Sequence, residues 1–193
     1  MKSVVSTKRR ILDSAYSLFV ENGYQGTSMR DIAKDAGIKA GSIYNHFGGK
    51  EEIFEAVFIE KHPLFRILEI LNDVKGETAE NLLTNAINQL HREFQRDKKL
   101  LNLFFIELIE MGGKHVPLAI KKNFPTDSNF MKQIFRVKSE IRDIREPVII
   151  RALIGTILAS IVFTWFIGES NIKRWGSMSE TTDVLLWGIL KSK

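Results

Sequence analysis

Apolar residues recur along this chain at helical spacing. The first stripe consists of four residues at positions i, i+4, i+7 and i+8, namely Ile11, Ala15, Leu18 and Phe19. It predicts a helix over 7–22, which Gly23 would end as a C-terminal cap. Later stripes predict a helix that starts at residue 50 and stops before Pro63, and further helices over 64–74, 78–97, 100–111, 117–122, 128–144, 147–167 and 179–190. No stretch alternates between polar and apolar residues as a half-buried strand does, so the pattern predicts an all-α fold.

Two short helical patterns meet at a glycine near the N-terminus. They cover 28–35 and 39–47, and Gly37 lies at the corner, where glycine adopts a left-handed backbone without strain. Ser28 is placed to cap the first pattern, and Asp31 three residues later completes the signature of a capping box. Two short helices joined by a tight glycine turn form a helix-turn-helix, whose second helix enters the DNA major groove.

This segment resembles the DNA-binding motif of the TetR family of bacterial transcriptional regulators. The resemblance is strong over residues 8–58, and beyond them it concerns only the helical layout. It implies a three-helix helix-turn-helix DNA-binding domain, assigned to residues 1–50, and a helical ligand-binding and dimerisation domain over 51–193. So short an N-terminal segment buries little surface by itself, so the helix that starts at residue 50 is expected to complete it.

The outer face of the second motif helix supplies candidate DNA contacts. Ile43 and Phe47 share the inner face of this helix. Phosphates require donors and positive charge, whereas bases are read by side chains that reach into a groove. The other positions point outward or flank the inner stripe, and they are the candidates for contact with DNA: Lys39, Ala40, Gly41, Ser42, Tyr44, Asn45 and His46.

The resemblance also assigns roles. It implies phosphate contacts from Thr27, Ser28, Tyr44 and Lys50. It implies contact with or approach to bases from Arg30, Lys39, Ala40, Ser42 and Asn45. Lys39 departs from the family pattern, in which a serine often caps this helix. A lysine cannot cap a helix N-terminus and is unfavourable against the dipole, but it is well placed to meet a phosphate or a guanine edge.

Charge and composition narrow the function. The net charge is +5, and most of the excess lies in the first 50 residues, which carry eight basic and four acidic side chains. A basic end suits a polyanion, although many proteins that do not bind DNA are mildly basic too. The absence of cysteine excludes disulfides, thiolate nucleophiles and Cys-ligated metals. The four histidines are scattered, and neither a phosphate-binding glycine loop nor a nucleophile elbow occurs, so no metal, cofactor or enzymatic activity is expected.

The expected larger domain is rich in aromatic and methionine side chains, which most often form core. The resemblance implies a small effector of unknown identity between its helices, in an apolar pocket with few polar anchors. The candidate lining residues are Phe104, Glu107, Leu108, Met111, Phe163 and Phe166. Glu107 is the candidate anchor for a cationic or hydroxylated ligand. The alternative is that Glu107 faces water or pairs with a neighbouring charge.

Residues 148–167 are almost entirely apolar and long enough to cross a membrane. Arg151 interrupts the run and no second such segment occurs, so the favoured interpretation is a helix buried between its own core and a second copy of the chain. Gly155 and Ala159 are four residues apart and would allow close helix packing. The dimer interface is therefore expected at Gly155, Leu158, Ala159 and Leu186.

These features predict a homodimeric transcriptional regulator, a ligand-responsive repressor that binds a palindromic DNA operator. No apolar leader precedes Ile11, so a cytoplasmic protein without a membrane partner is expected. The alternative from another class is a helical protein-interaction module that regulates through a partner without DNA binding. An enzyme is a more distant alternative.

Overall fold

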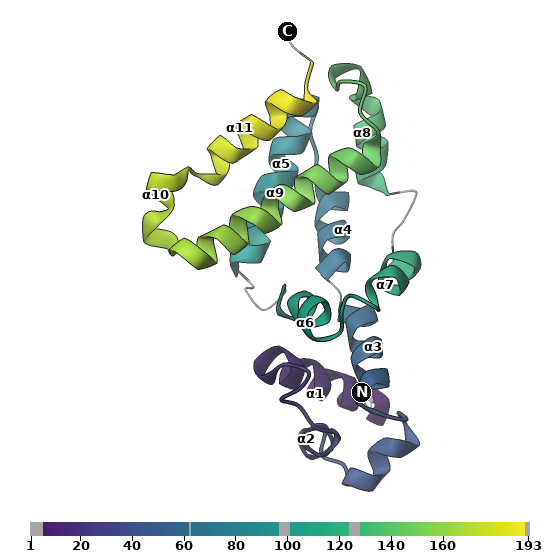
Figure 1. Ribbon diagram of the computed structural model, residues 1–193. Helices are drawn as coiled ribbons and strands as arrows, with labels where there is room; N and C mark the ends of the chain where they lie inside the picture. The colour runs from purple at the N-terminus through teal and green to yellow at the C-terminus, as the bar shows by residue number, and fades with distance from the viewer. Residues whose placement is uncertain (1–5, 62, 97–100, 124–127, 192–193) are drawn as a thin grey trace, which may run out of the picture. The chain divides into compact units, whose positions relative to one another are not determined.

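The computed structural model describes residues 6–61, 63–96, 101–123 and 128–191 (Figure 1). Over these ranges the regular structure is helical, and extended pairing is confined to one isolated antiparallel bridge between Ile141 and Leu190. The α-helices in chain order are α1 (Thr7–Asn22), α2 (Met29–Asp35), α3 (Lys50–Lys61), α4 (Pro63–Asp73), α5 (Ala79–Arg96), α6 (Asn102–Glu110), α7 (Val116–Asn123), α8 (Asn129–Arg136), α9 (Glu146–Ile167), α10 (Ile172–Trp175) and α11 (Met178–Ile189). Short 3₁₀-helices are η1 (Ala40–Asn45), η3 (Lys138–Glu140) and η4 (Glu169–Asn171). The predicted all-α fold is confirmed.

The helices form two compact units. Unit 1 contains α1, α2, η1, α3, α6 and α7, and unit 2 contains most of α4 together with α5 and α8 to α11. The division expected after residue 50 therefore falls inside unit 1, where Lys50 begins α3. The reason is that apolar side chains of α3, α6 and α7 bury themselves in the same core as those of α1 and α2.

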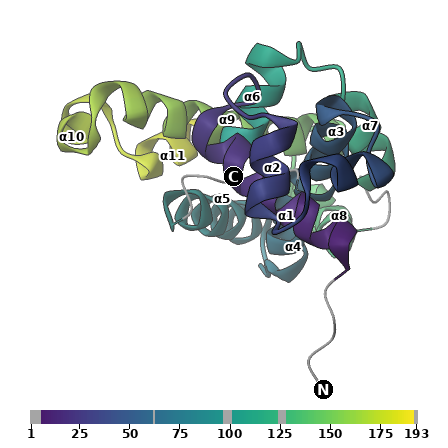
Figure 2. The same ribbon diagram turned by 90° about the horizontal axis from the view of Figure 1, so that it is seen from below.

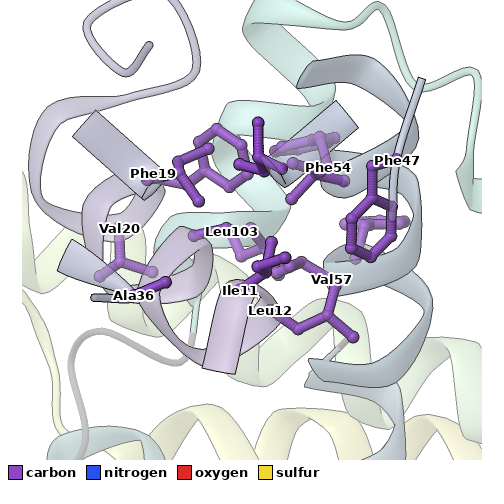
Figure 3. Close-up of a cluster of buried hydrophobic side chains, with 14 of the residues drawn as sticks. Ile11, Leu12, Phe19, Val20, Ala36, Phe47, Phe54, Val57 and Leu103 are labelled. Carbon is purple, nitrogen blue, oxygen red and sulfur yellow. The ribbon is translucent and has the colours of Figure 1, made fainter. Parts of the chain in front are cut away.

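The core of unit 1 is built on aromatic and branched aliphatic side chains. Phe19 of α1 and Phe54 of α3 meet edge to face, with ring centroids 5.2 Å apart. Leu103 reaches this cluster from α6 (Figure 3). Figure 2 shows α1, α2 and α3 grouped together, and direct contacts join α1 to both of the others. The long α1 thus supplies the platform on which the short elements of the motif are held.

The predicted ends of α1 are confirmed by its caps. Ser6 precedes the helix, and its hydroxyl oxygen accepts a hydrogen bond from the backbone N–H of Arg9 at 3.2 Å. At the other end Gly23 has a φ of 76°, and its N–H donates to the carbonyl of Phe19 at 2.9 Å. This positive φ is the reason that a glycine stands at this position.

Unit 2 is organised around α5 and α9, which pack against each other, with α11 in contact with both (Figure 1). The inner face of α9 carries residues spaced mainly by four, all of them buried: Ile149, Ile150, Leu153, Ile157 and Ile161. By length and composition this helix could span a membrane. Within the chain, 28% of its most apolar window is buried. A second apolar face of α9 is therefore left uncovered by unit 2.

The predicted helix over 128–144 is shorter in the structure. Helix α8 ends at Arg136, and the chain then passes through η3 into the bridge between Ile141 and Leu190. The bridge is closed by hydrogen bonds from the N–H of Arg142 to the carbonyl of Ile189 and from the N–H of Lys191 to the carbonyl of Glu140. Pairing with the end of α11 replaces the helical bonds that the sequence pattern favoured. The short α10 was not predicted.

Candidate nucleic-acid interface

Helix α2 is fixed at its start by the predicted capping box. The Ser28 hydroxyl oxygen accepts a hydrogen bond from the N–H of Asp31, and the N–H of Ser28 donates to the Asp31 carboxylate, each at 3.2 Å. The hydrogen bonds from Ser28 hold the pKa of Asp31 below its usual value. Ser28 is exposed, so the cap lies on the surface of the motif.

The corner between α2 and the next element is made by Gly37, whose φ is 66°. Its N–H donates to the carbonyl of Lys34, and the N–H of Ile38 donates to that of Ala33. These bonds close the end of α2 and turn the chain into η1. The predicted glycine corner is thus confirmed in its backbone geometry.

The second motif helix is a 3₁₀-helix rather than the expected α-helix over 39–47. It begins after Lys39, whose side chain makes no cap, and it is anchored by Ile43, which is fully buried, and by Phe47, which is 3% exposed. In a 3₁₀-helix, residues three apart lie one above the other. Gly41 therefore lies below Tyr44, and Ser42 below Asn45.

The predicted outward positions share one surface. Ser42 is half-buried, and the others are exposed: Lys39, Ala40, Gly41, Tyr44, Asn45 and His46. Tyr44 is 57% exposed although it is aromatic and lies next to the buried Ile43. A Cβ added at Gly41 would meet no atom within 4 Å, so nothing crowds the backbone there. Arg30 is exposed at the start of α2. The surface can therefore present donors, a phenol and an amide to one ligand.

Thr27 does not present its hydroxyl to this surface. The residue is 2% exposed, and its Oγ1 lies 2.9 Å from the carbonyl of Gly23 and 3.1 Å from that of Leu18. The hydroxyl thus stabilises the loop between α1 and α2. This differs from the phosphate contact that the family resemblance implies.

Lys50 also serves the same loop. Its Nζ donates to the carbonyls of Tyr24 and Thr27, each at 2.7 Å, and lies 4.2 Å from the centre of the Tyr24 ring. Two of its three ammonium hydrogens are therefore committed to main-chain oxygens. This internal role differs from the phosphate contact that the family resemblance implies, and it arises because the α1–α2 loop turns its carbonyls toward the start of α3.

The predicted ligand anchor, Glu107, is fully buried in unit 1 and has its own partner. Its carboxylate accepts the backbone N–H of His115 at 2.6 Å and lies 2.8 Å from Nδ1 of the same residue. The His115 ring is tilted against Phe54 at 5.8 Å between centroids. The alternative interpretation, pairing with a neighbour, is the one that the structure supports. Glu107 is thus an internal link between α6 and the start of α7.

The other predicted lining residues fall in both units. Met111 packs against the core of unit 1, Phe104 is half-buried, and Leu108 is 45% exposed. Phe163 and Phe166 belong to unit 2 and are exposed. The predicted set is therefore divided between the two units.

Sequence reasoning missed the contacts that the corner between α6 and α7 makes with the motif. The Glu110 carboxylate accepts the backbone N–H of Tyr24 at 3.2 Å and that of Gln25 at 2.8 Å. Lys114 forms an ion pair with Glu51 of α3 at 2.6 Å, which lowers the pKa of Glu51. The partners are more than 60 residues apart in sequence, so no local pattern could have identified them.

The candidate interface residues on α9 and α11 divide into two groups. Gly155 and Ala159 are exposed and Leu158 is half-buried, so these three residues stay predicted interface residues. Leu186 is only 5% exposed, because it points from α11 into unit 2, so it belongs to the core of the unit instead. Trp187 beside it is 82% exposed and was not assigned.

Among the described residues, no group of three or more His, Cys, Asp or Glu side chains is placed to hold a metal ion. The chemistry that the described surface offers is hydrogen bonding and charge.

Comparison with known proteins agrees with this geometry. Residues 11–57 match the model of the family described as bacterial regulatory proteins, tetR family. The chain is 24% identical to the HTH-type transcriptional regulator UidR of Escherichia coli K12 over 95% of this chain and 93% of that protein. It is 50% identical over 48 residues to IcaR of Staphylococcus aureus Newman, the negative transcriptional regulator of the biofilm operon icaADBC, a match that covers 25% of this chain and 26% of that one.

Solved structures show the same fold. A TetR-family transcriptional regulator from Haemophilus influenzae Rd superposes with a TM-score of 0.66 at 16% identity, over 96% of this chain and 97% of that chain. The likeness therefore covers both units of the fold and not only the motif.

Proposed function

The chain belongs to the TetR family of bacterial regulatory proteins, and on this premise we propose that it is a repressor that binds a palindromic operator as a homodimer and releases it when a small molecule binds. Its relatives are DNA-binding transcriptional regulators and not enzymes, and the chain is classed with them. The observation that carries the proposal is the exposed set of Lys39, which precedes η1, and Tyr44 and Asn45 on it, held by the buried Ile43 and Phe47.

The set divides by chemistry into two kinds of contact. Tyr44 and Lys39 offer a hydroxyl and a positive charge, which suit phosphate oxygens. Asn45 offers an amide, whose donor and acceptor match an adenine edge in the major groove. Arg30 and Ser42 complete the set that faces DNA. Ser28 stabilises this set by capping α2, and Lys50 stabilises it by binding the loop before α2.

The uncovered face of α9 and α11 is the proposed dimer interface. Phe166 is 86% exposed and Trp187 is 82% exposed, and both are large apolar side chains that a soluble protein rarely leaves in water. Gly155 and Ala159 on the same helix as Phe166 permit a close approach of helices. A second copy of the chain, which carries the same apolar face, is the matching occupant because two-fold interfaces are self-complementary.

Dimerisation determines the form of the operator. One reading head covers a half-site, so two-fold symmetry in the protein matches a palindrome whose half-site centres lie roughly 34–36 Å apart or a multiple of that. Repression is supported by the Staphylococcus aureus relative, which acts as a negative regulator. The protein would act in the cytoplasm, where the chromosome is accessible.

Control by an effector is proposed to act through α3. This helix starts beside the reading surface at Lys50 and ends at Lys61, immediately before the segment that leads into α4. A small rotation of α3 changes the separation of the two reading heads, whereas DNA demands one separation. An effector that prefers another separation weakens operator binding by the same factor by which DNA weakens effector binding.

The test is selection of bound duplexes from a random DNA pool with the full-length protein, followed by gel retardation of the recovered sequence at several salt concentrations. The expected result is a palindrome whose retention falls steeply with salt, because phosphate contacts release counterions. Failure to retard any duplex at low salt would leave the protein-interaction module as the better account.

A further inference from the structure

Unit 2 contains a cavity of about 260 Å³, and Phe163 is the one predicted ligand-lining residue among the described side chains around it. It lies where the C-terminal ends of α5 and α9 meet the turn that leads into α11. The lining residues that matter most are His91, Gln95, Phe163, Thr164, Trp175 and Thr181. This volume lies just below the usual range for ligand sites, so it suits a compact molecule.

One wall of the cavity is aromatic. The rings of Phe163 and Trp175 meet edge to face, with centroids 5.9 Å apart and planes inclined by 77°. Both rings remain partly exposed, by 41% and 64%. Flat apolar faces of this kind bind another ring by stacking or edge contact. The wall therefore favours a planar aromatic guest.

His91 provides an unmet hydrogen-bonding group at the cavity. Its Nδ1 is buried and has no hydrogen-bond partner among the residues that the structure describes. Buried polar atoms are rarely left unpaired, so this nitrogen points to a partner that comes from outside the chain. Burial lowers the pKa of His91 and favours the neutral ring. A neutral ring nitrogen is a donor or an acceptor according to tautomer, and a hydroxyl group can complement either.

The threonines of the cavity add a preference for a ligand that donates. Thr164 Oγ1 donates to the carbonyl of Ser160 at 2.8 Å, and Thr181 Oγ1 donates to that of Ser177 at 3.1 Å. Their hydrogens are used within the helices, so the hydroxyl oxygens can only accept further bonds. None of the lining side chains carries a full charge with His91 neutral. A charged ligand would therefore lose hydration without an ionic partner.

We propose that this cavity binds a small, neutral aromatic molecule that carries a hydroxyl group. Its ring packs against Phe163 and Trp175, and its hydroxyl hydrogen-bonds to Nδ1 of His91. The further statement that this molecule is the effector rests on the proposed function, whereas the binding itself does not.

The first experiment measures binding without DNA. Calorimetric titration of the full-length protein uses 4-ethylphenol as the probe, with 4-ethylanisole, in which the hydroxyl is methylated, and 4-ethylbenzoate, which is an anion, as comparisons. The expected result is saturable binding of 4-ethylphenol at least tenfold tighter than that of either comparison. Equal affinity for the phenol and the anisole would overturn the proposal, and so would the absence of saturable phenol binding.

A pair of variants on α5 assigns the contact. His91→Leu removes the ring nitrogen without introducing a charge, and Asn88→Leu makes the corresponding change at an exposed position outside the cavity. His91→Leu is expected to lower phenol affinity at least tenfold while it leaves anisole affinity unchanged, and Asn88→Leu to alter neither. Circular dichroism melts of both variants check that they are folded. An unchanged phenol affinity in His91→Leu would refute the role of Nδ1.

The second experiment separates this proposal from the proposed function. The phenol titration is repeated with the selected operator duplex bound. If the operator weakens phenol binding by the same factor by which the phenol weakens operator binding, phenols of this class are identified as effectors. Equal phenol affinity with and without operator would contradict the effector role and leave the cavity established. A protein that binds its operator but not the phenol refutes the cavity alone, and one that binds the phenol but no duplex refutes the regulator alone.

Discussion

Replacement of Lys50 by methionine tests whether this lysine is a part of the fold rather than a ligand for phosphate. The variant Lys50→Met keeps the aliphatic stem and removes the ammonium group, so the carbonyls of Tyr24 and Thr27 lose their donor. A hydrogen bond to a charged group contributes about 1.5–3 kcal/mol, and the lower end applies here because the side chain is half-buried and water reaches the site. The contact with the Tyr24 ring adds about 0.5 kcal/mol.

The two hydrogen bonds and the ring contact together give an expected loss of about 3.5 kcal/mol in the unfolding free energy of the protein. For a chain of this size that unfolds as a whole, this loss corresponds to a fall of roughly 7–14 °C in melting temperature. The control is Lys34→Met on α2, where the lysine is exposed and the change is expected to shift the melting temperature by less than about 2 °C.

The assay combines two signals. Far-ultraviolet circular dichroism follows the helices of both units, whereas the three tryptophans all lie in unit 2 and report on that unit alone. The dichroism transition of Lys50→Met should move to lower temperature. Affinity for random DNA, measured well below the transition, should change little. A variant that keeps the wild-type melting temperature but loses affinity for all duplexes alike would show that Lys50 holds a phosphate and that the reasoning is wrong.

Three further outcomes are expected. In gel retardation, Asn45→Ala should weaken binding of the selected operator by about 1–3 kcal/mol more than binding of random DNA. Tyr44→Phe should weaken binding of both DNAs alike, and the opposite pair of results would exchange the two roles. Leu158→Glu should give monomers in light scattering at micromolar concentration, because it places a charge in the proposed apolar interface, and an intact dimer would place that interface elsewhere. Because the folded-state pKa of Asp31 lies below its unfolded value of 3.8, its contribution to stability is complete above that pH and is lost as the pH falls through the folded value. Denaturant unfolding of wild type and Ser28→Ala should therefore differ near neutral pH and converge in acid, and a constant difference would contradict this.

Features that depend on local sequence were predicted well. The bounds of α1 follow from a stripe of apolar residues and a terminal glycine, and the capping box of α2 follows from Ser28 and Asp31. In each case, residues a few positions apart provide both the signal and the interaction. The exposed face of η1 is a similar case, because Ile43 and Phe47 settle which side is turned inward even though the helix is of the 3₁₀ type.

Features that depend on distant partners were not predictable. The pattern over 128–144 favours a helix, but Gln133 and Arg136 of α8 donate to carbonyls of Val74 and Gly76, and the chain then pairs with the end of α11. The candidate site shows the same limit. Nothing near Glu107 in the sequence indicates that its carboxylate accepts a hydrogen bond from His115 in the interior of unit 1. Amphipathic spacing determines which side of a helix is apolar, but it does not specify the partner of a buried charge.

The contribution of α6 and α7 to unit 1 has a consequence for how the protein is synthesised and recombined. When α1 to α3 have emerged from the ribosome, Leu103, Glu110 and Ala119 have not yet been synthesised. Leu103 and Ala119 are part of the core of unit 1, and Glu110 accepts a hydrogen bond from the loop after α1. The nascent motif must therefore wait for α7 before its apolar cluster is complete. A hybrid regulator built by exchanging only the first 60 residues would join a motif to another protein's α6 and α7. Transfer of operator preference to a new sensor should succeed when the segment from α6 to α7 travels with the motif.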